Sequence, residues 1–70
     1  MMLLVNTTRT KALYERNGQV YVGSINGAKD VDGWPMDARW ESSIEHFRRY
    51  EHLWIAQAWS TPAYAFRETI

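Results

Sequence analysis

The chain has 70 residues, with as many acidic as basic side chains, so its formal net charge at pH 7 is zero. A chain this short forms one domain, here residues 1–70, and buries only about 60% of the surface that its unfolded state exposes. The absence of cysteine excludes a disulfide framework and a thiolate metal site. The balanced charge disfavours nucleic acid as a partner, because non-specific binding to it needs a basic surplus.

Apolar segments in this chain are all short. The start, residues 1–5, is too short for the apolar core of a signal peptide. No apolar run approaches the length of a membrane span. We therefore expect a cytoplasmic protein with no membrane partner. Aromatic residues make up 14% of the chain, which is heavy for so small a core, so we expect some aromatic surface to meet a partner or a second copy.

The first half of the chain reads as strands. Residues 2–6 form a short apolar run that is typical of a strand. Asn17 and Gly18 stand between two further strand-like runs, 10–16 and 19–25. An Asn-Gly pair in this position is the strongest short-range mark of a hairpin, because a type I′ turn needs positive φ at both residues.

A two-residue turn fixes the register of the predicted hairpin. Arg16 then faces Gln19, and residues successively further from the turn pair in order, so that Tyr14 faces Tyr21. These two tyrosines are expected to form a cross-strand pair on the face away from the helix. The face expected to pack on the helix carries Leu13, Val20 and Val22.

Residues 35–51 give the best helix signal in the chain. Trp40, Ile44 and Phe47 recur at the i, i+4, i+7 spacing of an amphipathic helix, and a proline at position 35 suits the first helical turn. Residues 26–34 before it are rich in glycine and aspartate and form the longest predicted loop. Its last residue, a tryptophan, is expected to staple the start of the helix onto the core.

The predicted helix ends near Tyr50, because Glu51 would place a carboxylate on the middle of the apolar arc. Residues 53–59 and 63–69 are then read as a second hairpin. The sequence thus predicts an α+β fold: a small antiparallel sheet of four to five strands, in the order β-β-β-α-β-β, with one main helix packed on one face. The alternative is three strands, one long helix over 35–59 and a final strand.

Familiar catalytic and metal-binding patterns do not fit this sequence. Asp30 and Asp32 begin like a calcium loop, but position six, where an EF-hand needs glycine, is Pro35. His46 and His52 are six positions apart and cannot share a metal as an i, i+4 pair. No nucleophile elbow or phosphate loop is present. We therefore expect no metal, no cofactor and no enzymatic activity.

Charge is segregated along the chain in spite of the zero total. Residues 1–29 carry +3, residues 30–47 carry −4 and residues 48–70 carry +1. On the predicted helix, the carboxylates of the middle segment form a stripe along one flank. The stripe, extended into the preceding loop, consists of Asp30, Asp32, Asp37, Glu41 and Glu45. A solvated face is the simpler interpretation, whereas a docking patch for a basic groove is the functional one.

These observations favour a small protein–protein interaction module over an enzyme. We expect an inhibitor or regulator that binds a larger protein with a basic surface, such as a nucleic-acid-binding complex. Its size and lack of motifs are typical of viral and mobile-element proteins that disarm host defences. One alternative is a single-strand nucleic-acid binder that uses the hairpin face with Tyr14, Arg16 and Tyr21. Another is a homo-oligomeric structural protein, at its simplest a homodimer.

Overall fold

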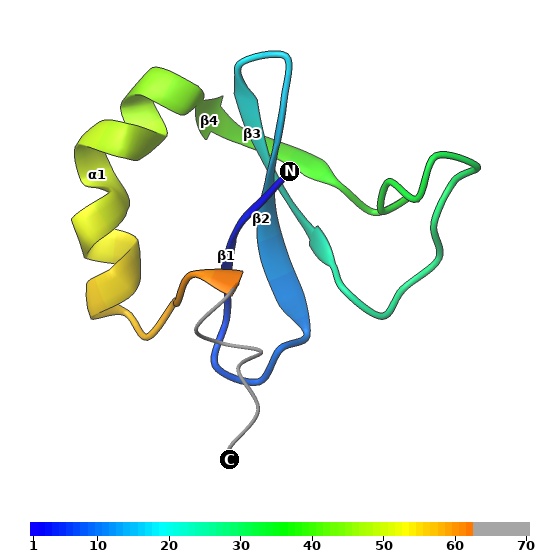
Figure 1. Ribbon diagram of the computed structural model, residues 1–70, viewed down its shortest axis with the longest axis horizontal. Helices are drawn as coiled ribbons and strands as arrows, with labels where there is room; N and C mark the ends of the chain where they lie inside the picture. Colours follow the sequence, from blue (N-terminus) through cyan, green and yellow to red (C-terminus); the bar gives the residue numbers. More distant parts are fainter. Residues whose placement is uncertain (63–70) are drawn as a thin grey trace.

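The computed structural model of the protein describes residues 1–62 and shows a four-stranded antiparallel sheet followed by one helix (Figure 1). The predicted α+β class is confirmed. The strands lie in the sheet in chain order, and the predicted strand 63–69 falls outside the described residues. The elements are β1 (Met2–Val5), β2 (Lys11–Arg16), β3 (Gln19–Ser24), β4 (Arg39–Ser43) and α1 (Ile44–Ala56).

The hairpin of β2 and β3 forms as predicted. Asn17 and Gly18 both have positive φ, at 53° and 79°, as a type I′ turn requires. The Glu15 carboxylate accepts a hydrogen bond from the Gly18 N–H at 2.9 Å and closes the turn. The pairs include Arg16 with Gln19, Tyr14 with Tyr21 and Leu13 with Val22, so the predicted register is confirmed.

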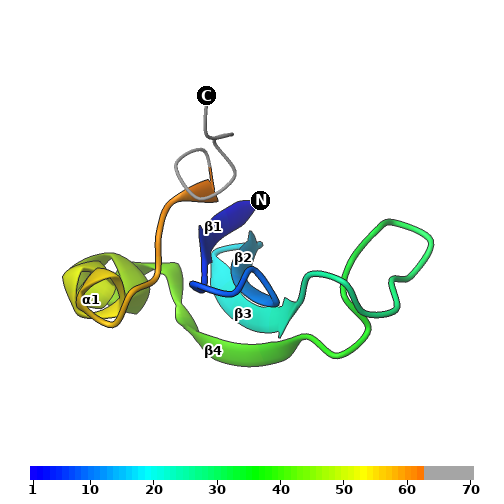
Figure 2. The ribbon, with the colours of Figure 1, turned by 90° about the horizontal axis from the view of Figure 1, so that it is seen from below.

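The core lies between the hairpin and α1, which lies beside the sheet next to the end of β4 (Figure 2). Its buried cluster consists of Leu4, Leu13, Val20 and Phe47. Phe47 is the one buried residue of α1. Partly buried side chains pack around this cluster, including Val22 and Ile44. The hairpin face that was expected to pack on a helix therefore does so.

The predicted helix over 35–51 is wrong in its first half. Residues 39–43 form β4, which pairs with the outer edge of β3, and the helix begins only at Ile44. Pairing satisfies the backbone groups of that edge, which a helix would have left open. Ser43 marks the change, because its side chain accepts a hydrogen bond from the His46 N–H at 3.1 Å and caps α1.

Trp40 consequently lies outside the core. In β4 it pairs with Tyr21, on the face of the sheet opposite the core residues Leu13 and Val20, and 61% of its surface is exposed. The order within the described residues is therefore β-β-β-β-α. The i, i+4, i+7 spacing of Trp40, Ile44 and Phe47 was misleading, because the first of the three belongs to a different element.

The prediction of a strand over 53–59 is also wrong, since α1 runs on to Ala56. Trp54 lies seven residues after Phe47 and packs on the same core, which extends the helix past the predicted stop. The chain leaves α1 through Ala58, whose φ is 71°, and returns to β1. There Ser60 and Val5 exchange two backbone hydrogen bonds, of 2.8 and 2.9 Å.

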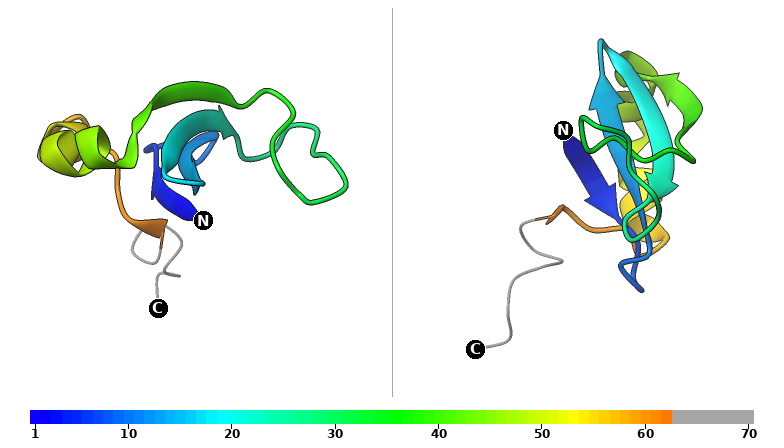
Figure 3. Two further views of the ribbon diagram at one scale, coloured as in Figure 1. Left: turned by 90° about the horizontal axis from the view of Figure 1, so that it is seen from above. Right: turned by 90° about the vertical axis from the view of Figure 1, so that its right-hand side faces the viewer.

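The loop between β3 and β4 lies at the opposite end of the molecule from α1 (Figure 3). Pro35 is buried against Gly23, where a Cβ atom would come within 2.9 Å of the proline Cβ. Gly23 therefore permits this close approach. Pro35 therefore anchors the loop. The expectation that it begins a helix is wrong. The described residues contain no helix of the length and apolar character that crossing a bilayer requires.

Phe47→Ala should unfold the domain. The substitution costs about 3–5 kcal/mol, which is of the order of the whole stability that a core of this size supplies. Ile55→Ala is the matched control, because Ile55 is on the same helix and 49% exposed. Urea denaturation followed by circular dichroism should show a cooperative transition for the control and none for Phe47→Ala; a transition close to wild type in Phe47→Ala would contradict this core.

Candidate protein-binding surface

Aromatic side chains cover the face of the sheet opposite the core. The ring of Trp34 lies 5.6 Å from that of Tyr14 and 5.4 Å from that of Tyr21, measured between centroids. The guanidinium carbon of Arg16 lies 3.9 Å from the centroid of the Trp34 ring, in cation–π geometry. Trp34 therefore fastens its loop to the hairpin. The expectation that it staples the start of the helix is wrong.

This packing engages the hairpin residues that were considered for single-stranded nucleic acid. Stacking of bases needs open ring faces and available cations. Tyr14 and Tyr21 are only partly exposed, and Arg16 already lies on Trp34. Burial, followed by the nearby charge of Asp37, raises the pKa of the Tyr14 hydroxyl. The proposed nucleic-acid face stays a prediction, and these contacts do not favour it.

The carboxylates expected to form one stripe are dispersed in the structure. Asp30 accepts hydrogen bonds from the N–H groups of Asp32 and Trp34, both at 2.9 Å, and so holds the loop turn. Asp37 accepts bonds from the backbone N–H of Ser24, at 3.0 Å, and from its hydroxyl. The predicted stripe along one flank of a helix is therefore wrong, because Asp37 and Glu41 precede α1.

Only two members of the predicted stripe lie near the helix. Glu41 is an exposed residue of β4, at a bulge where Trp40 and Ser42 pair with consecutive residues of β3. Glu45 is exposed in the first turn of α1, where its charge suits the helix dipole. Whether any of the five carboxylates contacts a partner stays a prediction.

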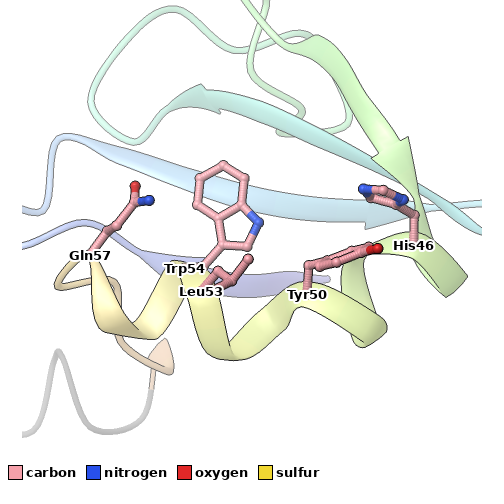
Figure 4. A pocket seen from close by; sticks show the side chains of 5 residues that line it. All are labelled: His46, Tyr50, Leu53, Trp54 and Gln57. Carbon is pink, nitrogen blue, oxygen red and sulfur yellow. The ribbon is translucent and has the colours of Figure 1, made fainter.

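Two shallow hollows lie along α1 and β4 and share His46. The first, which we call the helix hollow, has a volume of about 300 Å³ (Figure 4). It is lined by His46, Tyr50, Leu53, Trp54 and Gln57. The second, which we call the strand hollow, has a volume of about 260 Å³. It is lined by Trp40, Glu41, Ser42, Ser43 and His46.

Two large side chains of the helix hollow are exposed, and a third is held by the core. Leu53 and Tyr50 are 48% and 39% exposed. The His46 ring lies 4.6 Å from the Tyr50 ring. Trp54 packs on the core and makes an edge contact with Trp59, with 5.1 Å between ring centroids. Trp54 therefore gives the hollow one apolar wall that is already packed on the core before anything binds, which lowers the entropic cost of binding at that wall.

The sequence contained a signal for this surface that its periodicity concealed. Ser43 is a favoured N-cap residue, and an acidic residue follows it at Glu45. From that start, the residues of the helix hollow recur at helical spacing, from His46 to Gln57. The predicted start at position 35 shifted the apolar face onto Trp40 and hid this arrangement.

Comparisons with known proteins supply no relative, since no family model, no curated protein and no solved structure matches the chain. Within residues 1–62 no group of three or more side chains could hold a metal ion. The surface chemistry of the described residues is therefore the basis for a functional proposal.

Asp37→Asn should destabilise the protein at neutral pH but not in strong acid. Hydrogen bonds from the Ser24 side chain and backbone lower the pKa of the Asp37 carboxyl. A carboxyl with a lowered pKa stabilises the fold above its unfolded pKa, about 3.9, and this stability is lost as pH falls through the folded value. Melting temperatures measured against pH should converge in acid. Asp32→Asn, in the same loop, is the control and should melt like wild type at neutral pH; a constant gap for Asp37→Asn would contradict the linkage.

Proposed function

We propose that this protein is a small protein-binding module that acts as an inhibitor or regulator by occupying the surface of a larger protein through its helix hollow. The observation that carries the proposal is the exposure of Tyr50 and Leu53 beside the core-packed Trp54 in that hollow. Tyrosine and tryptophan are enriched among the residues that dominate binding energy at protein interfaces.

The size of the helix hollow favours a protein partner over a small molecule. Its volume of about 300 Å³ is at the lower limit of small-molecule pockets, which hold about 300–1,000 Å³ and bury most of their ligand. The helix hollow lies open at the surface along α1 (Figure 4). An apolar side chain anchored on a larger protein surface would fit it, because the remainder of that surface would close the open side.

The charge beside the helix hollow favours a partner with basic residues at one end of the contact. Glu45 precedes His46 in the first turn of α1 and is exposed. Opposite charges across an interface raise the association rate and select the correct register. The β3–β4 loop, which carries Asp32, lies at the opposite end of the molecule from α1 (Figure 1), so its carboxylates are not part of the proposed contact.

Leu53→Arg should abolish capture of the partner while leaving the fold intact. The matched control is Ile55→Arg, because Ile55 is equally exposed on the same helix, at 49% against 48%. It lines a third hollow, of about 380 Å³, beyond the end of α1 with Trp59 and Thr61. Tagged wild-type and variant proteins would be used to capture partners from host lysate, with quantitative mass spectrometry. A protein enriched by wild type and Ile55→Arg, but lost with Leu53→Arg, supports the proposal. Equal loss with both variants, or with neither, contradicts it.

Glu45→Lys should slow association with the captured partner and weaken its dependence on salt. The Debye length is about 10 Å at 0.1 M salt, so a charge beside the hollow acts on the encounter at low ionic strength. Asp32→Lys makes the same charge change at the other end of the molecule and is the control. Surface plasmon resonance at several salt concentrations would measure both. If Asp32→Lys also slowed association, the result would contradict the proposal, because it would show that the loop carboxylates take part in binding.

A further inference from the structure

Strand β4 is an open edge of the sheet. Among residues 1–62 its only strand neighbour is β3. The opposite edge, β1, is partly covered by the bridge between Val5 and Ser60. An open edge presents backbone N–H and C=O groups that can pair with another strand. The neighbouring surface also holds the strand hollow, so backbone and side-chain contacts are available together.

The charges on this edge are complementary to those of a second copy of the same edge that runs antiparallel to it. Arg39 and Glu41 flank Trp40 and are exposed, and neither forms an ion pair with another residue of 1–62. If two copies of β4 run antiparallel about a two-fold axis at Trp40, Arg39 of each copy stands opposite Glu41 of the other. We propose that two copies of this chain form a homodimer in this register, which goes beyond the proposed partner binding.

Trp40 supplies the apolar centre of the proposed contact. It is 61% exposed, and its indole N–H donates a hydrogen bond of 2.7 Å to the Gln19 side chain, which fixes the ring. In the two-fold arrangement, Trp40 of one copy lies against Trp40 and the strand hollow of the other. Large aromatic side chains near the centre of an interface contribute most of its binding energy.

The pattern of charge favours a second copy over an unrelated partner. A uniform basic groove would attract Glu41 but repel Arg39, two positions away. The antiparallel copy satisfies both because its own sequence supplies the opposite order of charges, as an isologous interface requires. The bulge at Glu41 twists the edge and shortens any ladder, so Trp40 and the charges, rather than a long row of backbone bonds, set the register.

This dimer would leave most of each helix hollow open. The residues from Tyr50 to Gln57 lie further along α1 than the proposed contact, which reaches the helix only at His46. The dimer would therefore present two partner-binding hollows. A bivalent module binds a partner that repeats its site more tightly than either hollow alone, provided that both can be reached together.

Charge reversal tests the register. Sedimentation equilibrium of the purified wild type, from low micromolar to near-millimolar concentration, should show a monomer–dimer equilibrium. Arg39→Glu and Glu41→Arg should each raise the dimer Kd by about tenfold or more, because each creates two like-charge contacts. The double variant Arg39→Glu/Glu41→Arg should restore dimerisation. A monomeric wild type at every concentration, single variants without effect, or a double variant that stays monomeric would overturn the proposal.

Two further variants make the outcome unambiguous. Because the chain has no cysteine, Arg39→Cys and Glu41→Cys each carry a single thiol and keep Trp40. Facing Cα atoms in an antiparallel pair are about 4.5–5.5 Å apart, within the range that a disulfide spans. Oxidation of an equimolar mixture should give a mixed covalent dimer, because position 39 of one copy faces position 41 of the other, whereas either variant alone should give much less; an equal yield from the mixture and from the single variants would reject the axis at Trp40. Leu53→Arg should dimerise like wild type, so loss of partner binding and loss of dimerisation are separate results.

Discussion

The pairing of β4 with β3 is the constraint on which the rest of the structure depends. It removes residues 39–43 from the helix, turns Trp40 to the face opposite the core and ends at Ser43, the N-cap of α1. The N–H of Ile44 donates a hydrogen bond of 2.9 Å to the carbonyl of Gly18, which ties the start of the helix to the hairpin turn. The position of α1, and hence of Phe47 in the core, follows from where this strand stops.

This arrangement divides the aromatic residues of the described chain between two tasks. Trp34 packs with Tyr14 and Tyr21 and holds the β3–β4 loop on the sheet. Tyr50 and Trp54, in contrast, line the helix hollow, where the Tyr50 side chain is 39% exposed. The abundance of aromatic residues that first indicated a partner therefore has a structural explanation on one face of the sheet and keeps its functional interpretation on α1.

The acidic residues of the predicted stripe also fall into two groups in the structure. Asp30 and Asp37 accept hydrogen bonds from the backbone and shape the loop, so their cost as neighbouring like charges is offset locally. Glu41 and Glu45 are exposed near the two hollows, where a partner's charges can meet them. An acidic stripe on one helix is replaced by separate sites at the two ends of the molecule, each with its own physical role.

The sequence by itself determined the hairpin, its register and the core positions Leu13 and Val20, because an Asn-Gly turn and strand alternation act over a few residues. Only the tertiary structure decided residues 35–43. Their periodicity suits a helix, but the open edge of β3 and the buried contact of Pro35 with Gly23 draw them into a loop and strand. The pairing of β4 with β3 joins residues about twenty positions apart in the chain. The local sequence pattern of residues 35–43 carries no information about the unpaired edge of β3. The candidate surface on α1 was hidden for the same reason, since its position follows from where β4 ends.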